Sequence, residues 1–422
     1  MTSPPIHAQE RKVHSDIQNH HDWLRNRKIS NPETLGLYKK SDKHGNHNYA
    51  PGDYLGMMWL NEGEKRTVLR VDSKFPKMDY VAMYVECVTD PEIGNQIIKH
   101  LNFWPDQDLI ETSEDDFSIL SVISYLRQLN EMCQLLQPHL SRKEQNLICK
   151  RKGKTNHAKN IRYNIIQGRR DRTYSEYQSI SHDTPANQIL CTALERAARY
   201  VIKYHDETTR NMLEQWIHIS RASLRHVSAI HVKPHHFDAA HKNDKSPLYR
   251  SSLTLAKAVL NQLGYNPQAE LQQNQIPPFS LYSPKLFERY AEMKLRKDSS
   301  KKNSSNIVAP ITMIDTDNPG AFNASVQPDF YDSDKTTPRI IDAKYKTLDV
   351  KSINREDKYQ IIAYSQHRGL LNEMKCMHGS VQLGFAYPSV IDSKKIINNK
   401  VSRAFFHDIV IYEIPCPKKQ RR

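Results

Sequence analysis

The sequence predicts an α+β multidomain protein with a mixed N-terminal region, a helical middle region and a C-terminal α/β domain. The chain has 422 residues, which favours two or three domains. Short β-branched and aromatic runs lie towards both ends, whereas the middle has the three- and four-residue apolar spacing of helices. We therefore expect a disordered tail (1–20), a mixed α/β region (21–165), a helical middle (166–275) and an α/β domain (276–422).

Composition narrows the class of protein. Lys and Arg number 61 against 47 Asp and Glu, so the formal net charge is +14. Such a chain attracts a polyanion, but charge alone does not choose between DNA, RNA and an anionic membrane. We expect no membrane span and no secretory signal, because long apolar runs are missing, and we therefore expect a cytoplasmic protein. The six cysteines form no C-x-x-C pair, and no P-loop motif is present.

The mixed region combines predicted strands with one helix and a basic segment. Strand-like runs cover 48–60, 66–72 and 80–88, and helical spacing covers 117–140. The basic segment that follows contains Lys152 and Lys154. It is either a solvated loop or a surface that binds phosphates or a partner, and the residues leave both readings open.

The middle and C-terminal segments have clearer element signals. Thr184-Pro185 is a typical helix start, with a capping side chain followed by proline at the first helical position. In the C-terminal segment we expect helices and strands in the order α–β–β–β–α–β–β, at 283–297, 307–314, 325–331, 339–345, 354–368, 381–387 and 408–414.

The most informative residues are two aspartates and a lysine on neighbouring predicted strands. Asp329 ends one run, and Asp342 and Lys344 belong to the next, so a hairpin would bring the three together. Residues i and i+2 of a strand point to the same face. Two carboxylates and an ammonium make a poor core but a good site for Mg²⁺ beside a phosphate. The structural alternative is a set of turn and edge charges.

Two helical residues extend this set. Glu288 stands between apolar residues of the helix before the strands, and Gln360 begins the apolar stripe of the helix after them. Either side chain can face the cleft of the carboxylates. The alternatives are a surface charge for Glu288 and helix packing for Gln360 and its neighbour Tyr359.

In this order the residues resemble the PD-(D/E)xK nuclease superfamily, which has a restriction-endonuclease-like α/β domain. Within it, the segments 341–346 and 357–364 look like McrC, the nuclease subunit of the McrBC modification-dependent restriction system. The resemblance implies a type IV restriction endonuclease subunit that cleaves DNA with Mg²⁺, for which Mn²⁺ may substitute. It assigns Asp329 and Asp342 as metal ligands, Lys344 as the catalytic lysine, and Glu288 and Gln360 as supporting active-site residues.

The resemblance also implies partners. McrC-like proteins dock on a hexameric McrB ring, an AAA+ GTPase, and their N-terminal half inserts into the ring and stimulates it. Double-stranded DNA is the expected substrate, with Lys346, Tyr359, Lys152 and Lys154 as candidate DNA contacts. Two alternatives stay open: a standalone PD-(D/E)xK nuclease of repair or recombination, and a non-cleaving adaptor that only stimulates an AAA+ partner.

Overall fold

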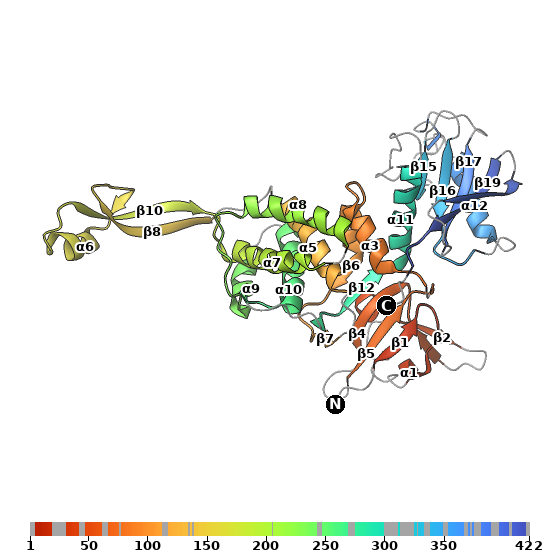
Figure 1. Ribbon diagram of the computed structural model, residues 1–422, viewed down its shortest axis with the longest axis horizontal. Coiled ribbons are helices and arrows are strands. Elements are labelled where there is room, and N and C mark those ends of the chain that lie inside the picture. The colour runs from red at the N-terminus through yellow and green to blue at the C-terminus, as the bar shows by residue number, and fades with distance from the viewer. Residues whose placement is uncertain are drawn as a thin grey trace. The chain divides into compact units, whose positions relative to one another are not determined.

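The computed structural model divides into two compact units (Figure 1). Residues 1–110 and 278–422 form the first unit, and 111–277 form the second. The units therefore do not follow the four consecutive segments expected from the sequence. The structure describes residues 5–18, 31–41, 47–60, 66–75, 77–111, 117–133, 136, 139–204, 206–242, 247–268, 275–298, 311–312, 325–326, 328–332, 338–348, 353–366, 370–371, 374, 381–389, 396–404 and 407–418.

A five-stranded sheet organises the N-terminal part of the first unit. Its order is β1 (Ile6–Gln9), β5 (Thr67–Asp72), β4 (Tyr54–Leu60), β12 (Phe279–Tyr282) and β6 (Leu101–Phe103). The prediction of a disordered tail is wrong for β1, which pairs in parallel with β5 and buries its alternate side chains. The insertion of β12 explains why this unit is discontinuous in sequence.

One predicted strand of this region is a helix. Residues 80–88 fall within α3 (Tyr80–Thr89), and seven of its side chains are buried. Because apolar residues occupy most faces of this helix, the sequence shows no 3.6-residue apolar period. Its β-branched and aromatic residues then favoured a strand prediction. The helix begins at Asp79, whose side chain accepts a hydrogen bond from the Ala82 amide at 2.9 Å.

The C-terminal part of the first unit contains a second five-stranded sheet. Its order is β15 (Phe330–Asp332), β16 (Arg339–Ala343), β17 (Gln382–Ser389), β19 (His407–Pro415) and β18 (Ile397–Ala404). The central strands β16, β17 and β19 are parallel, and the edge strands β15 and β18 are antiparallel to their neighbours. Most of the predicted strands are present, whereas β18 was not expected.

Two predicted helices flank the β15–β16 pair in the chain. They are α11 (Ser283–Asp298) and α12 (Arg355–Gln366), close to the expected bounds. Ile361 and Tyr364 of α12 pack in an apolar core with Ile340 of β16 and Phe385 of β17. Of the predicted strand 307–314, residues 307–310 and 313–314 lie outside the described residues.

Shorter elements complete the description. They are α1 (Ser15–Gln18), the 3-10 helices Pro32–Thr34 and Ile98–His100, β2 (Tyr38–Ser41), β3 (His47–Ala50), α4 (Gly94–Ile97), β7 (Ile110–Glu111), β11 (Gln275–Ile276), β13 (Ile311–Thr312) and β14 (Ser325–Val326).

Helices form the body of the second unit. They are α5 (Ser118–Met132), α7 (Pro185–Ile202), α8 (Glu207–Ser223), α9 (Pro234–Lys242) and α10 (Pro247–Leu263). The predicted cap of α7 is confirmed, since the Thr184 side chain accepts from the Asn187 amide. Helix α5 ends before residue 140, where a helix was still expected. Over the described residues, we find no helix with the length and apolarity needed to span a bilayer.

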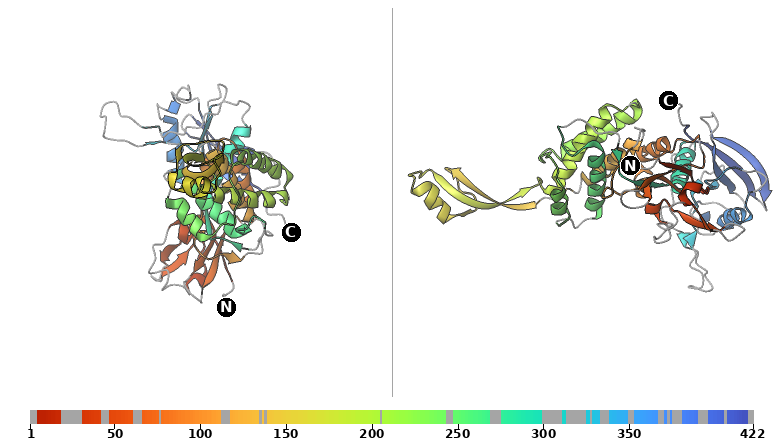
Figure 2. Two further views of the ribbon diagram at one scale, coloured as in Figure 1. Left: turned by 90° about the vertical axis from the view of Figure 1, so that its left-hand side faces the viewer. Right: turned by 90° about the horizontal axis from the view of Figure 1, so that it is seen from below.

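A long hairpin extends from these helices (Figure 2). Strand β8 (His139–Ile148) pairs along its length with β10 (Arg172–Ser181), and the connection contains β9 (Lys154–Thr155), α6 (His157–Asn160) and a π-helix (Ile161–Ile165). The prediction of a helical region from residue 166 is therefore wrong up to residue 181.

Candidate active site

The two predicted aspartates meet where β15 and β16 pair. Asp329 directly precedes β15, and Asp342 lies near the end of β16. The strands are antiparallel, with Phe330 opposite Ile341, so the predicted hairpin is confirmed. The Oδ2 atom of Asp329 accepts a hydrogen bond from the Ala343 amide at 2.8 Å. This bond holds one carboxylate beside the strand that carries the other.

The electrostatics of the two aspartates are those of crowded, buried acids. Burial, followed by the negative charges of Glu288 and Asp342, raises the pKa of Asp329 well above its ordinary value. Burial also raises the pKa of Asp342, although Lys344 opposes the shift. Both shifts mean that a positive charge at this position would stabilise the ionised carboxylates.

Lys344 is fixed among three oxygen-bearing side chains. Its Nζ lies 2.5 Å from Asp342 Oδ2 and 3.3 Å from Asp357 Oδ1, and it donates to Gln360 Oε1 at 3.0 Å. Burial lowers the pKa of Lys344, but the two aspartates outweigh burial and the net shift is upward. Gln360 in turn donates to the Tyr364 hydroxyl at 2.7 Å, so helix α12 orients the lysine.

Asp357 is a site residue that the sequence reasoning missed. Besides its contact with Lys344, it forms an ion pair with Lys346. Burial raises its pKa, but the hydrogen bond with Lys346 and the charge of Lys344 reverse the shift, and the net pKa is lowered. The signal was available, because Asp357 precedes Gln360 by three residues and thus shares its helix face.

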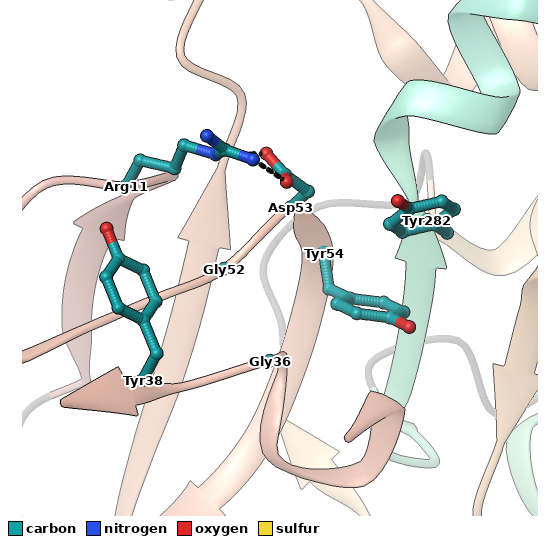
Figure 3. A pocket seen from close by; sticks show the side chains of 7 residues that line it. All are labelled: Arg11, Gly36, Tyr38, Gly52, Asp53, Tyr54 and Tyr282. Carbon is teal, nitrogen blue, oxygen red and sulfur yellow. Dashed lines mark hydrogen bonds and ion pairs between the residues drawn. The ribbon is translucent and has the colours of Figure 1, made fainter. Parts of the chain in front are cut away.

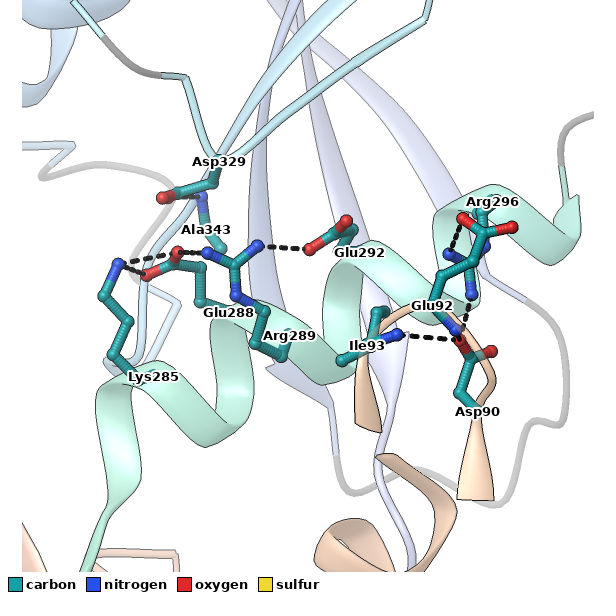
Figure 4. Close-up of polar contacts among 10 residues, drawn as sticks. All are labelled: Asp90, Glu92, Ile93, Lys285, Glu288, Arg289, Glu292, Arg296, Asp329 and Ala343. Carbon is teal, nitrogen blue, oxygen red and sulfur yellow. Dashed lines mark hydrogen bonds and ion pairs between the residues drawn. The ribbon is translucent and has the colours of Figure 1, made fainter. Parts of the chain in front are cut away.

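Helix α11 brings Glu288 to the same place. Its carboxylate lies 2.5 Å from Lys285 Nζ and 3.3 Å from an Arg289 nitrogen. Figure 4 shows Glu288 between these two cations and facing Asp329. Glu288 therefore lies near both aspartates, and its negative charge adds to the upward shifts of their pKa values.

Further ion pairs along α11 lead away from this site (Figure 4). Arg289 pairs with the buried Glu292 at 2.6 Å, and Arg296, near the end of the helix, pairs at 2.5 Å with both Asp90 and Glu92. These contacts join α11 to the segment after α3. They fix the helix, and through it they fix the position of Glu288.

Three other predicted site residues, Tyr359, Lys152 and Lys154, are exposed. Tyr359 is 56% exposed on α12, and its hydroxyl accepts from Arg355 at 2.7 Å, a contact that faces solvent. Lys152 and Lys154 are exposed on the hairpin of the second unit, where the Lys152 Nζ lies 4.3 Å from the ring centre of Tyr177.

The carboxylates of this site suit a hard cation whose other ligands are water and substrate. Among the residues that the structure describes, no three His, Cys, Asp or Glu side chains form a group that could hold a metal ion. Two adjacent carboxylates with raised pKa remain, and Mg²⁺ is commonly bound by one or two carboxylates, waters and substrate phosphate. Asp329 and Asp342 fit that coordination pattern.

The fold and the site define an α+β protein with a buried cluster of acidic residues and one lysine at a sheet edge. A family model for the McrBC 5-methylcytosine restriction system component matches residues 96–373. The chain therefore belongs to the McrBC family, which confirms the family predicted from the sequence motifs.

Solved structures from Thermococcus gammatolerans are similar at low identity. One is a refined half-complex from a tetradecameric assembly of McrB AAA+ hexamers with bound McrC, at 15% identity and a TM-score of 0.42, covering 98% of this chain and 94% of that chain. Another is a cryo-EM structure of the McrBC complex, at 15% identity and a TM-score of 0.34, covering 71% and 89%. No curated protein matches the chain in sequence.

Proposed function

We propose that this chain is the DNA-cleaving subunit of a McrBC-type restriction system and that its C-terminal domain is a PD-(D/E)xK nuclease. The observation that carries the proposal is the convergence of Asp329, Asp342 and Lys344 at one sheet edge. Glu288 and Gln360 reach the same edge from the two flanking helices. A cluster of this composition suits phosphodiester hydrolysis and has no evident value as a structural core.

The roles follow from the contacts. Mg²⁺, or Mn²⁺ in its place, held by Asp329 and Asp342 would supply Lewis-acid chemistry at the scissile phosphate. Lys344 holds a positive charge beside that position, where it stabilises negative charge that develops on the phosphate oxygens. Gln360 and Asp357 orient Lys344, and Glu288 adds negative charge to the site. Lys346 binds the DNA backbone from the rim.

We propose that the hairpin of the second unit contacts an AAA+ GTPase hexamer. Its connection exposes large apolar side chains next to basic ones, which is a surface that favours a partner. The apolar side chains are Ile161 (48% exposed), Tyr163 (40%), Ile165 (61%) and Ile166 (75%). The exposed basic side chains are Lys150, Arg151, Lys152, Lys154, Arg162, Arg169 and Arg170. In this proposal Lys152 and Lys154 contact the partner or the DNA that it moves.

An asparagine cluster explains why these apolar residues face outward. Asn164 is buried, and it exchanges hydrogen bonds of 2.8 and 2.9 Å with Asn146 and donates to Asn160 at 2.8 Å. The connection is thus held by amide hydrogen bonds and not by its own isoleucines. Those isoleucines remain available to a partner.

Cleavage of long methylated and unmethylated DNA tests the proposal. The reactions contain Mg²⁺ and either GTP or ATP, with and without a McrB-like AAA+ partner. We expect cleavage that needs the partner and nucleotide and that is lost in Asp342→Ala. Glu356→Ala is the control, because it also removes a carboxylate, but an exposed one on helix α12. It should cleave like the parent chain.

The same experiment separates the two alternatives. Cleavage without any partner would favour a standalone repair or recombination nuclease. Stimulation of the partner's GTPase without cleavage under any condition would favour the adaptor and would contradict the catalytic roles. The convergence of Asp329, Asp342 and Lys344 favours a nuclease, because an adaptor needs none of them.

A further inference from the structure

A hollow of about 510 Å³ lies in the N-terminal part of the first unit (Figure 3). It contains none of the residues of the candidate active site. Three tyrosines from three strands line it: Tyr38 of β2, Tyr54 of β4 and Tyr282 of β12. Its size is within the range of small-molecule sites.

The tyrosines give the hollow aromatic walls. The rings of Tyr54 and Tyr282 lie with their centres 5.0 Å apart at 43°, and Tyr38 stands on the opposite side in Figure 3. All three side chains are only partly buried, so their rings remain open to a ligand. Planar groups stack on such surfaces whatever their hydrogen-bonding pattern.

Two glycines let the backbone form the floor. Gly36 has φ +63°, a conformation that other residues rarely adopt. A Cβ atom there would lie 2.8 Å from the Cδ2 atom of the Tyr54 ring. A Cβ atom on Gly52 would lie 2.6 Å from the carbonyl oxygen of Gly36. The floor therefore has no side chains, and the Tyr54 ring can lie close to it.

The polar rim is held from several directions. Arg11 Nε donates to Asp53 Oδ1 at 2.6 Å, and the Arg11 amide donates to the Pro51 carbonyl at 2.9 Å. The Ser283 amide and hydroxyl both donate to the Asp53 carbonyl, at 3.0 and 3.1 Å. The rim is thus fixed before any ligand arrives, which reduces the entropy lost on binding.

Positive charge borders the hollow. The Arg11 side chain is 61% exposed although it is paired with Asp53. Two further exposed lysines do not line the hollow but lie next to residues that do: Lys12 follows Arg11 in the chain, and Lys40 is two positions after Tyr38 on the same face of β2. A ligand with a planar ring and an attached negative charge matches both the walls and the rim.

From these features we infer that the hollow binds an unstacked base of a single-stranded nucleic acid, with its phosphates at the basic rim. An aromatic side chain of a protein would fill the walls but would bring no negative charge to the exposed basic side chains nearby. The inference goes beyond the proposed function, because it concerns single strands and a site that contains no catalytic residue.

Fluorescence anisotropy with the full chain in EDTA tests the inference. The probes are a labelled oligothymidylate and an abasic strand of equal length, which keeps the phosphates and lacks the bases. We expect the abasic strand to bind more weakly. Tyr38→Ala should weaken binding of oligothymidylate by about 5- to 100-fold, because stacking on one aromatic residue has this range of effect. Tyr38→Phe keeps the ring and should bind like the parent chain.

A second variant and a cross-link give independent readouts. Tyr54→Ala should weaken binding as well, but Tyr54 also packs against the N-terminal core, so thermal unfolding must show that the variant folds. If it does not fold, Tyr38→Ala decides. Photolysis of an oligonucleotide that contains 5-iodouracil should cross-link to a tyrosine of the hollow.

Several outcomes would overturn the inference. They are equal affinity for the thymidylate and abasic strands, unchanged binding by folded Tyr38→Ala, and cross-links only outside the hollow. A protein side chain would then be the better candidate occupant. Because EDTA suppresses metal-dependent cleavage, a failure of the nuclease proposal would leave these measurements unaffected.

Discussion

The proposed catalytic cluster and the hairpin differ in how their charged side chains are placed. In the cluster, Asp342, Lys344 and Asp357 are largely buried, and each charge lies next to another side chain of the same site. On the hairpin, basic side chains such as Arg169 and Arg170 are exposed beside the exposed Ile166. The first arrangement suits the proposed catalysis, because it fixes the positions of the charged atoms. The second leaves charge and apolar area for another molecule, so substitutions in the two regions should have separable effects.

The largest effect that we expect is at Lys344. Lys344→Ala removes the positive charge beside Asp342 and should reduce DNA cleavage by about 100-fold or more, in the range seen when a preorganised electrostatic donor is lost. Lys346→Ala is the matched control, since Lys346 also pairs with Asp357 but lies further along the chain. Single-turnover cleavage should fall less than about tenfold in the control. Equal losses in both variants would contradict a special role for Lys344.

The hairpin should affect a partner and not the chemistry. Ile165→Ser with Ile166→Ser removes two exposed apolar side chains and should weaken binding to the AAA+ partner by about 10- to 30-fold, the effect of losing an interface anchor. The measurement is the concentration of this chain needed for half-maximal stimulation of GTP hydrolysis. Ile202→Ser is the control, because Ile202 is 67% exposed on α7 and outside the hairpin. A matching loss in that control would show that exposed isoleucines act nonspecifically.

The sequence predicted one of these regions far better than the other. The helix, hairpin and helix around Asp342 were recognisable because each element has an apolar face and the site residues have short, fixed spacings. Strand β10 was missed, and β8 with it, because side chains on both faces of β10 are partly or fully exposed and only Ser175 is buried, which removes the alternation that marks a half-buried strand. Their stability comes from pairing over ten residues, and that pairing is not visible in either strand alone.

Long-range contacts account for most of the other misses. The insertion of β12 between β4 and β6 could not be predicted from residues 279–282, because its partner strands are distant in sequence. Helix α3 lost its period because it is buried on most sides. Asp357 was overlooked because its role depends on two lysines that approach from another element.

A smaller effect is expected for Asp357→Asn. This variant tests whether the ion pair with Asp357 positions Lys344. The substitution keeps the shape of the side chain but removes the charge that faces Lys344 and Lys346. Cleavage should fall by about tenfold, since geometry at the reacting centre is loosened without loss of a reacting group. Glu356→Gln, one residue away and exposed, should have no effect. An Asp357→Asn variant that binds DNA less tightly yet cleaves at the parent rate would assign Asp357 to binding.

The smallest effect on cleavage is expected for Glu10, a buried acid of the first unit that lies outside the proposed active site. Glu10 is as buried as Asp342, but its partners are not residues of the proposed site: it accepts hydrogen bonds from the Lys74 amide at 3.0 Å, the Tyr345 hydroxyl at 3.1 Å and the Ser283 hydroxyl. Burial raises the pKa of Glu10 despite these bonds. The folded state therefore holds the proton more tightly than the unfolded state, and stability falls as pH rises from the ordinary value of the acid through its raised value.

Glu10→Gln should flatten that part of the stability profile. The amide keeps an oxygen for Lys74 and Tyr345, and its NH₂ group can donate to the Ser283 oxygen. The single Ser283 hydroxyl proton, which Glu10 and the Asp53 carbonyl share in the parent chain, can then go to Asp53. Denaturant unfolding between pH 4 and 8 should show the variant gaining stability relative to the parent chain as pH rises. Cleavage at a fixed fraction of folded protein should be unchanged, because Glu10 touches none of the acids at the β15–β16 edge. A loss of cleavage in folded Glu10→Gln would mean that Glu10, through its hydrogen bond with Tyr345, sets the position of Lys344. Glu10 would then count as a positioning residue of the proposed active site.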